Sequence, residues 1–597
     1  MALFAKVLVA NRGEIAVRVF RTLRELGIGA VAVYSEADRG SLHAALADEA
    51  HLLGPGPPAE SYLHQERVLE AARRAGAEAI HPGYGFLAEN AGFARAVEGA
   101  GLVWIGPPPE AIEAMGSKVT ARRLMQEAGV PVIPGTTEPV ESVDDVLALG
   151  EEHGWPLAIK ASAGGGGKGL KVVRSPEEAE RALASAQREG ESYFADATVY
   201  VERFLEDPRH VEVQVLADAH GNVVHLGERD CTIQRRHQKL VEETPSPAVT
   251  PELRERIGAI AVDAARAVGY RGAGTIEGLL DRDGNYFFLE MNTRIQVEHT
   301  VTELVTGVDL VREQVLAAAG EPLSFVQHDV RFSGHAIECR VNAEDPANGF
   351  LPAPGTITAY REPAGPGVRV DSGVVAGSEV VGLYDPLVAK LVVWDADRER
   401  ARRRMLRALE EYVVEGVTTL LGFHRALLEH ECFAAGETCF GVVESESLAA
   451  RAAELSSAGA RAPHDGGAAR LREQRVGVEL DGRRFDVTLL RPEPPHAELA
   501  RRRRERIGGG AHHAAAREAV VSPMQGTVLA VEVAEGDEVR EGQVICVVEA
   551  MKMENEITAH RRGIVTGLSV ASGEQVATGQ VICVVAQEGE AEPELGL

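Results

Sequence analysis

Two acidic residues near a dense run of polar residues could hold a metal ion. Glu277 stands in GTIEGLL and Glu290 in FFLEMNTRIQVEH, and Asp283 and Gly284 between them predict a hairpin turn. On adjacent antiparallel strands the two carboxylates would share one face of the sheet. Because Mg²⁺ prefers hard oxygen ligands, the two glutamates and the amide of Asn292 form a predicted Mg²⁺ or Mn²⁺ site.

The polar run continues beyond this site at alternating positions. Positions 290, 292, 294, 296 and 298 would project from one face of an extended segment. Five polar residues on one strand face predict a functional site rather than a solvent-facing strand.

A glycine-rich loop, ASAGGGGKGLK at 161–171, follows the predicted strand LAIK. Its glycines Gly164, Gly165, Gly166 and Gly167 would let backbone amides approach phosphate oxygens closely, although a plain flexible turn has the same composition. The loop is not a Walker P-loop, because Gly169 stands where that motif requires Ser or Thr.

An internal repeat frames a single lysine near the C-terminus. Residues 526–549 and 563–586 align without a gap and share 13 identities in 24 positions. Period-two strands punctuated by glycines predict two intertwined half-barrels that bury both VICVV strands. Lys552 lies between the halves in EAMKME, at a predicted exposed turn. A lone lysine there would be an ordinary surface residue, but two flanking methionines at an exposed tip favour a docking surface.

Sheets must position these residues. KVLVA at 6–10, a helical pattern ending at Gly27, and AVAVYS at 30–35 predict a βαβ unit. Further strands in 77–85 and 102–106 predict a parallel sheet with helices on both faces. No GxGxxG follows the first strand, which disfavours a dinucleotide site.

Composition excludes several classes of function. The formal net charge of −28 opposes the phosphate contacts of nucleic-acid binding. The six cysteines are scattered without a CxxC pair, which favours a reducing compartment and predicts no disulfide framework. The first residues lack a signal-peptide core and no run of 18 apolar residues occurs, so we expect a cytoplasmic enzyme without membrane contact.

Residues 520–586 resemble a biotinyl carrier domain, whose AMKM signature identifies Lys552 as the residue that a biotin protein ligase modifies. A lipoyl carrier has the same fold and pseudo-symmetry, and the methionines on both sides of Lys552 favour biotin. The resemblance implies a flattened all-β barrel with biotin on Lys552.

Residues 3–448 resemble the biotin carboxylase branch of the ATP-grasp superfamily, through ANRGEIAVR, HPGYGFLAEN, RDCTIQRRHQK and GYRGAGTIE. Glu277, Glu290 and Asn292 correspond to the family's metal ligands. Ala163 and Lys168 depart from the family's usual loop. The positions that resemble its ATP contacts are the loop glycines with Lys118, Lys160, Glu202, Leu205, His210, Gln234 and His237.

The resemblance also implies a two-stage chemistry. Glu298 resembles a general base that deprotonates bicarbonate, and the groups that would hold the anion are Lys239, Arg294, Gln296 and the Val297 backbone. Attack on ATP would give carboxyphosphate, which releases CO₂ beside biotin. Arg340 resembles the arginine that steadies the oxyanion of deprotonated biotin; without the resemblance, a surface pair with Glu338 or Glu344 would explain it as well.

These features predict a multidomain α/β protein with five segments. They are a parallel-sheet N-terminal pre-ATP-grasp domain (1–115), an α+β ATP-grasp domain with a glycine-rich lid (116–330), a C-terminal carboxylase domain (331–448), a linker with a short hairpin around Asp481 and Gly482 (449–515), and the biotinyl carrier (516–590).

The leading hypothesis is the α-subunit of an acyl-CoA carboxylase. It would carboxylate biotin on its own carrier and supply a separate carboxyltransferase β-subunit that uses acetyl-CoA or propionyl-CoA, for fatty-acid or malonyl- and methylmalonyl-CoA synthesis. The hairpin at 474–491 is a weak candidate for docking that β-subunit. We also expect a homo-oligomer within a larger complex. Alternatives are methylcrotonyl-CoA, pyruvate or urea as acceptor, or an ATP-grasp ligase with a non-biotin carrier.

Overall fold

The structure is a computed structural model that divides into two compact units, the first of which holds most of residues 1–456. Within the described part of the chain, no helix combines the length and apolarity that crossing a membrane requires. The described residues are 3–136, 139–140, 142–161, 170–194, 198–236, 238–459, 471–480, 483–492, 519–550 and 553–586.

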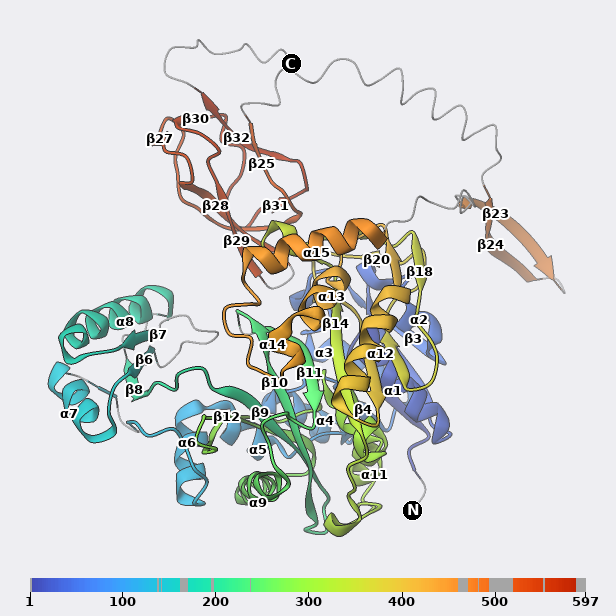
Figure 1. Ribbon diagram of the computed structural model, residues 1–597. Helices are drawn as coiled ribbons and strands as arrows, with labels where there is room; N and C mark the ends of the chain where they lie inside the picture. The colour runs from blue at the N-terminus through green and yellow to red at the C-terminus, as the bar shows by residue number, and fades with distance from the viewer. Residues whose placement is uncertain are drawn as a thin grey trace. The chain divides into compact units, whose positions relative to one another are not determined.

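The N-terminal segment, drawn in blue in Figure 1, forms the predicted parallel sheet, and its strand order is β3-β2-β1-β4-β5. Helix α1 (Gly13–Glu25) buries Ile15, Val19 and Leu23, which recur every four residues along one face. The chain then turns at Gly27, whose φ of +72° suits glycine. The strands are β1 (Lys6–Val9), β2 (Gly29–Ser35), β3 (Glu49–Gly54), β4 (Ala79–His81) and β5 (Val103–Trp104), and the other helices are α2 (Leu42–Leu46), α3 (Gln65–Ala75), α4 (Ala91–Gly99) and α5 (Pro109–Gly116).

A small antiparallel sheet of order β7-β6-β8 follows helix α6 (Lys118–Glu127). Helices α7 and α8 lie beside this sheet (Figure 1), and its core joins Leu157, Ile159 and Val201 to apolar residues of both helices. The elements are α7 (Val143–His153), β6 (Leu157–Ala161), β7 (Leu170–Val173), α8 (Ala179–Phe194) and β8 (Val199–Arg203).

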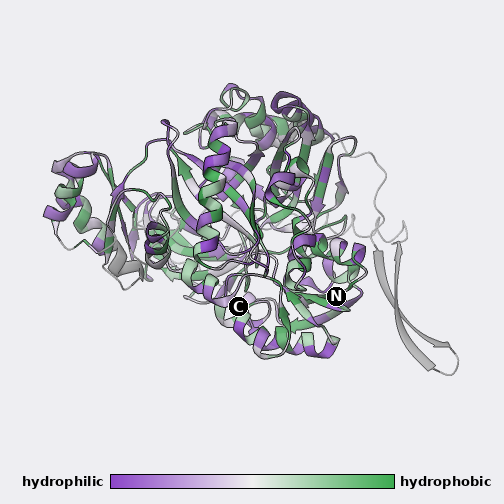
Figure 2. Ribbon diagram, turned by 90° about the horizontal axis from the view of Figure 1, so that it is seen from below, coloured by the Kyte–Doolittle hydropathy of each residue, from purple (hydrophilic) through white to green (hydrophobic). Residues whose placement is uncertain are grey.

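An eight-stranded sheet of order β13-β12-β9-β10-β11-β14-β21-β19 forms the centre of the first unit. It runs across the expected domain boundary at residue 330, because β11 pairs with β14. Helices around it alternate between hydrophilic and hydrophobic residues, as helices with one buried face do (Figure 2). The elements are β9 (Arg209–Ala217), β10 (Val223–Arg235), β11 (Gln238–Thr244), α9 (Pro251–Ala267), β12 (Gly272–Leu280), β13 (Tyr286–Asn292), α10 (His299–Thr306), α11 (Leu310–Ala318), β14 (His335–Asn342), β19 (Val368–Ser372), β21 (Leu387–Asp395) and α12 (Arg398–Glu411).

The predicted hairpin between β12 and β13 is confirmed. Glu277 lies directly opposite Glu290, and the turn closes where Asp281 accepts hydrogen bonds from the backbone amides of Asp283 and Asn285. The prediction of one extended face from 290 to 298 is wrong beyond Asn292, because β13 ends there and α10 begins at His299. The last residues of the run are therefore gathered by a turn rather than by strand alternation.

A buried ion pair on β11 leads to the first prediction. Burial alone would raise the pKa of Glu243, but hydrogen bonds from His335 and Arg398 outweigh it and lower the pKa from 4.5 to about 2. A depressed carboxyl pKa stabilises the fold fully above about pH 4.5, and this stabilisation is lost as the pH falls toward 2.

Replacing Glu243 by Gln is therefore expected to lower the free energy of unfolding at pH 7 by about 3 kcal/mol. Urea unfolding of the chain and of the Glu243→Gln variant at pH 7 and pH 3 measures this, and the difference between them should shrink at the lower pH. An equal difference at both pH values would contradict it.

The C-terminal part of the first unit ends later than the sequence predicts. Helix α15 (Glu446–Gly459) crosses the expected linker start at 449, and its Leu448, Ala452 and Leu455 are buried. The Ala-rich composition of this stretch is that of a packed helix as well as of a linker. The remaining elements here are β15 (Glu344–Asp345), β16 (Leu351–Pro352), β17 (Gly355–Thr356), β18 (Ala359–Arg361), β20 (Glu379–Val380), β22 (Val413–Glu415), α13 (Leu421–Glu429) and α14 (Glu431–Ala434).

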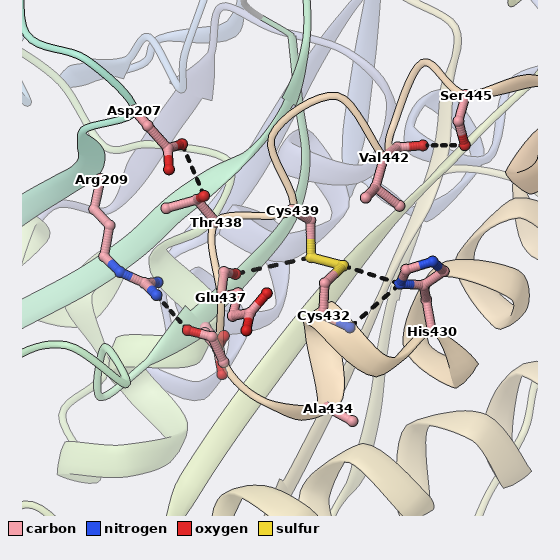
Figure 3. The surroundings of a disulfide bond; sticks show 12 residues. Asp207, Arg209, His430, Cys432, Ala434, Glu437, Thr438, Cys439, Val442 and Ser445 are labelled. Atoms are coloured by element: carbon pink, nitrogen blue, oxygen red, sulfur yellow. Dashed lines mark hydrogen bonds between the residues drawn. A yellow bond between two sulfur atoms is a disulfide. The ribbon is translucent and has the colours of Figure 1, made fainter.

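The scattered cysteines form no framework, but one pair that the sequence analysis did not predict, Cys432 and Cys439, is bonded (Figure 3). The loop that they close reaches the start of β9, where the Thr438 hydroxyl donates to Asp207 at 2.8 Å. A search for CxxC pairs or a dense cysteine framework does not find two cysteines seven residues apart on one folded loop.

The second unit contains a hairpin and a pseudo-symmetric barrel. The hairpin pairs β23 (Leu471–Leu480) with β24 (Arg483–Pro492), as predicted; Arg501–Arg504 of the expected linker lie outside the described residues. The barrel has two four-stranded sheets, β25-β32-β30-β27 and β29-β28-β26-β31, each with strands from both halves of the repeat. Both VICVV strands are buried, which confirms the intertwined halves. The strands are β25 (Ala519–Val521), β26 (Gly526–Val531), β27 (Glu538–Val539), β28 (Val544–Ala550), β29 (Met553–Thr558), β30 (Gly563–Thr566), β31 (Gln575–Val576) and β32 (Val581–Ala586).

Candidate active site

Lys239 is the centre of a buried network of charges on the large sheet. From β11, its Nζ donates hydrogen bonds to Glu212 at 2.6 Å, to Glu277 at 2.9 Å and to Glu298 at 2.7 Å. Three carboxylates from β9, β12 and the turn before α10 thus meet one ammonium group. Such a cluster is ordered only if its charges are paired, because burying an isolated charge costs several kcal/mol.

Arg340 holds the other side of Glu298. From β14, its Nη2 donates to Glu298 at 2.9 Å and its Nε to Glu242 at 2.6 Å. Arg340 therefore does not form the surface pair with Glu338 or Glu344; it is partly buried and pairs with Glu242 and Glu298. Glu298 lies between an ammonium and a guanidinium group, both of which favour its ionised form.

The pKa of Glu298 reflects these neighbours. Burial raises it, but the charges of Lys239, Arg340 and Arg229 outweigh burial and hold the pKa well below its usual range. The carboxylate is therefore ionised at neutral pH. It can accept a proton from an acid bound beside it, which is the state that a general base requires.

Arg294 and Gln296 join the same network from the turn. Arg294 donates to Asn292 Oδ1 at 2.7 Å, and Gln296 donates to Glu277 at 2.6 Å. Of the predicted anion-binding side chains, Lys239 bonds directly to Glu298, whereas Arg294 and Gln296 join the network through Asn292 and Glu277.

The predicted metal ligands fit a hard cation. Glu277 and Glu290 lie opposite each other on β12 and β13, and Asn292 donates to Glu277 Oε1 at 2.7 Å. Burial raises the pKa of Glu277, but the stronger effects of Lys239 and His210 bring the pKa below its usual value. The carboxylate is therefore ionised. A metal ion here would replace some of the hydrogen bonds that Glu277 now accepts. His210, expected as an ATP contact, lies 2.9 Å from Glu277 and has ligand atoms near those of Glu212 and Glu277.

The expected ATP contacts lie on two sheets. On the small sheet, Lys160 donates a hydrogen bond to Glu202, and Leu205 after β8 is buried. On β10, Gln234 stands directly opposite Lys239 in the sheet and donates to the Cys231 carbonyl at 2.7 Å. The placement of His237, Gly164–Gly167 and the Lys118 side chain lies outside the described residues.

Sequence reasoning missed residues that complete the network. Arg229 is wholly buried and donates to Glu212 and Gln296, at 2.5 and 2.7 Å. Glu89, which sequence reasoning left without a role, accepts from Arg294 at 2.8 Å. Glu212 could have been found, because it alternates with His210 on the strand HVEVQV and so shares its face.

The carrier lysine follows a strand and precedes another that pairs with it. Ala550 at the end of β28 pairs with Met553 at the start of β29, so Met551 and Lys552 form the link between paired strands. These two residues are themselves outside the described residues.

Comparisons with known proteins match both units. Four family models align with the chain: Biotin carboxylase, N-terminal domain at 3–112; Carbamoyl-phosphate synthase L chain, ATP binding domain at 117–326; Biotin carboxylase C-terminal domain at 338–445; and Biotin-requiring enzyme at 518–585.

Individual relatives agree with the models. The biotin-dependent acyl-coenzyme A carboxylase alpha3 subunit of Mycobacterium leprae is 48% identical over 574 residues, covering 93% of this chain and 94% of the relative. A pyruvate carboxylase subunit of Methanothermobacter thermautotrophicus is 56% identical over 435 residues, covering 73% of this chain and 88% of the relative.

A solved structure matches the first unit. The biotin carboxylase domain dimer of the Hydrogenobacter thermophilus 2-oxoglutarate carboxylase, in complex with MgADP, ADP and bicarbonate, has 47% identity and a TM-score of 0.70, over 74% of this chain and 99% of that one. With these matches, the chain belongs to the biotin carboxylase family and carries a biotin-type carrier domain in the same polypeptide.

Proposed function

We propose that this protein is a biotin carboxylase that carboxylates biotin on its own carrier domain, using ATP and bicarbonate, as the α-subunit of an acyl-CoA carboxylase. The observation that carries the proposal is the ionised Glu298 held between Lys239 and Arg340, with Gln296 donating to the neighbouring Glu277. Bicarbonate must be both held and deprotonated. A carboxylate base next to cationic and amide donors provides for both.

The first step uses this group. Lys239, Arg294, Gln296 and the Val297 backbone hold bicarbonate, and Glu298 takes its proton. The oxygen of the deprotonated anion attacks the γ-phosphorus of ATP, the bond to the β-phosphate oxygen breaks, and carboxyphosphate and ADP form. Lys160, Glu202, Leu205, His210 and Gln234 are assigned to ATP, with His237, Lys118 and the loop glycines.

Mg²⁺ held by Glu277, Glu290 and Asn292 would supply charge neutralisation for the phosphoryl oxygens. These residues bind and orient it, and the hydrogen bonds from Lys239 to Glu277 and Glu298 link the metal ligands to the base. Removing one metal ligand should therefore weaken Mg²⁺ binding more than it weakens bicarbonate binding.

Replacing Glu290 by Gln tests this assignment. We expect the free Mg²⁺ concentration at half-maximal ATP cleavage to rise at least tenfold, because one anionic oxygen ligand is lost. The measurement is the rate at fixed ATP over a Mg²⁺ titration, with Glu252→Gln on the exposed start of α9 as control. An unchanged Mg²⁺ requirement in Glu290→Gln would remove it from the metal site.

Biotin attached to Lys552 would supply the nitrogen that accepts the carboxyl group. The phosphate released with CO₂ from carboxyphosphate would take the proton from that nitrogen, and Arg340 would hold the oxyanion that develops on the acceptor, since a fixed guanidinium suits that charge. A biotin protein ligase would modify Lys552 beforehand.

The acyl-CoA acceptor is supported by similarity over both units. The Mycobacterium leprae relative aligns over 93% of the chain, including the carrier, whereas the pyruvate carboxylase relative aligns over 73%. We propose acetyl-CoA or propionyl-CoA as acceptor, a separate carboxyltransferase β-subunit, homo-oligomerisation of the α-subunit within the larger complex, and a cytoplasmic location. The catalytic domains are proposed to span 1–115, 116–330 and 331 to the end of α15, and the carrier 516–590.

Acceptor choice is tested with the purified α-subunit together with its co-purified β-subunit. We expect ATP-dependent carboxylation of acetyl-CoA or propionyl-CoA and none of pyruvate. Carboxylation of pyruvate alone would replace the acyl-CoA proposal and leave the biotin carboxylase proposal in place.

A further inference from the structure

Residues 293–298, between β13 and α10, carry most of the proposed bicarbonate ligands and are called the bicarbonate turn below. Lys390 contacts this turn and has no part in the mechanism described above. It lies on β21, its side chain is 0% exposed, and its Nζ donates to the Val297 carbonyl oxygen at 2.9 Å. In the sheet it stands directly opposite Arg340, whose guanidinium donates to Glu298 at 2.9 Å. Side chains of directly opposite residues share a face. Neighbouring cations on two strands therefore hold two consecutive residues of the turn.

The peptide groups of this turn are fixed on both sides of Val297. The Gln296 carbonyl lies 2.7 Å from His299 Nδ1, which must carry the hydrogen because a carbonyl only accepts. Burial keeps the pKa of His299 well below its usual value, so the ring is neutral. In a trans peptide, C=O and the following N–H point in opposite directions. Holding the carbonyls of Gln296 and Val297 therefore directs the N–H groups of Val297 and Glu298.

Lys390 also ties the turn to helix α1 of the N-terminal segment. Its Nζ lies 3.1 Å from Glu14 at the start of α1 and 3.9 Å from Asp371 on β19. Glu14 in turn accepts a hydrogen bond from the Tyr84 hydroxyl. An ammonium group has three donors, so one lysine can serve a carbonyl and acidic neighbours together. Through Lys390 of β21, the turn is thus anchored to α1 and β19 as well, and all three elements are distant from it in sequence.

We propose that Lys390 is a positioning residue for bicarbonate: by holding the Val297 carbonyl, it fixes the backbone that faces the anion and the base beside it. This inference rests on the proposed biotin carboxylase function and adds a residue that acts through Val297 rather than by touching substrate. Because the ATP contacts lie on other elements, loss of Lys390 should affect bicarbonate far more than ATP.

The variant Lys390→Met retains a long, unbranched side chain and removes the positive charge and the three hydrogen-bond donors. We expect its KM for bicarbonate in ATP cleavage to rise at least tenfold, while its KM for ATP stays within twofold. The variant also leaves Glu14 buried without its cation, which costs stability. The double variant Lys390→Met with Glu14→Gln removes that charge, so its thermal midpoint should recover while its bicarbonate KM stays raised.

Arg254→Met is the matched control. It also takes the cation from a buried glutamate, Glu228, to which Arg254 donates at 2.7 Å from both Nε and Nη2. Both of these hydrogen bonds join α9 to β10 and leave the bicarbonate turn untouched. The control should therefore lower the thermal midpoint without changing the bicarbonate KM.

A bicarbonate KM within twofold of wild type in Lys390→Met, or equal changes in both KM values, would overturn the role of Lys390. A wild-type protein whose ATP cleavage does not depend on bicarbonate would instead overturn the proposed function.

Discussion

Replacing Lys552 by Arg is expected to remove all biotin from the protein. Lys552 is the sole lysine between residues 519 and 586, and the pairing of Ala550 with Met553 puts it in the link between β28 and β29. Arginine keeps the charge, but its guanidinium does not form the amide through which biotin is attached. Intact mass of protein expressed with a biotin ligase measures the result, and the wild type should carry one biotin.

A displaced lysine makes this test specific. The double variant Lys552→Arg with Arg540→Lys offers a lysine after β27, where the side chain is exposed. Since methionines flank Lys552 and not position 540, the double variant should remain unmodified. Biotin on the displaced lysine would show that any exposed lysine of the carrier suffices, and biotin on Lys552→Arg would place the attachment elsewhere.

Replacing Glu298 by Gln is expected to lower bicarbonate-dependent ATP cleavage by about 10²- to 10⁴-fold, the usual contribution of a general base. The amide retains the size of the carboxylate but cannot take a proton from bicarbonate. It also removes the negative charge that Lys239 and Arg340 share. Initial rates at saturating ATP and bicarbonate measure the loss in kcat.

Glu242 provides the matched control. It is buried and also accepts from Arg340, and its pKa is raised to about 7, with burial as the largest cause and Arg340 opposing it. Because Glu242 has no contact with Lys239 in the described hydrogen bonds, Glu242→Gln should cost less than tenfold in rate. A loss in Glu242→Gln as large as in Glu298→Gln would mean that the Arg340 charge network, and not the base, limits the reaction.

Much of the site could be predicted because it depends on short-range patterns. The β12–β13 hairpin follows from Asp283 and Gly284, and its register then puts Glu277 opposite Glu290. The repeat likewise predicts intertwined halves, because two equivalent half-barrels each need a partner to bury their VICVV strands. In both cases the local pattern already contains the contact.

The rest depends on contacts that sequence spacing does not contain. Arg229 reaches residues of β9, β12, α10 and the turn before it, and Lys390 reaches Val297 across 93 positions of sequence. The end of β13 at Asn292 is set by the helix that follows, which overrides the alternation of polar residues. The disulfide of Cys432 and Cys439 likewise requires the folded loop after α14.

The measurement that tests the central claim most directly is transfer of labelled bicarbonate to the chain's own carrier. Biotinylated wild-type protein is incubated with ATP, Mg²⁺ and labelled bicarbonate, and label on the protein is counted after rapid gel filtration. We predict ATP-dependent label that is absent from Lys552→Arg and strongly reduced in Glu298→Gln. Label that appears without ATP, or ATP cleavage without any label on the biotinylated wild type, would contradict the account.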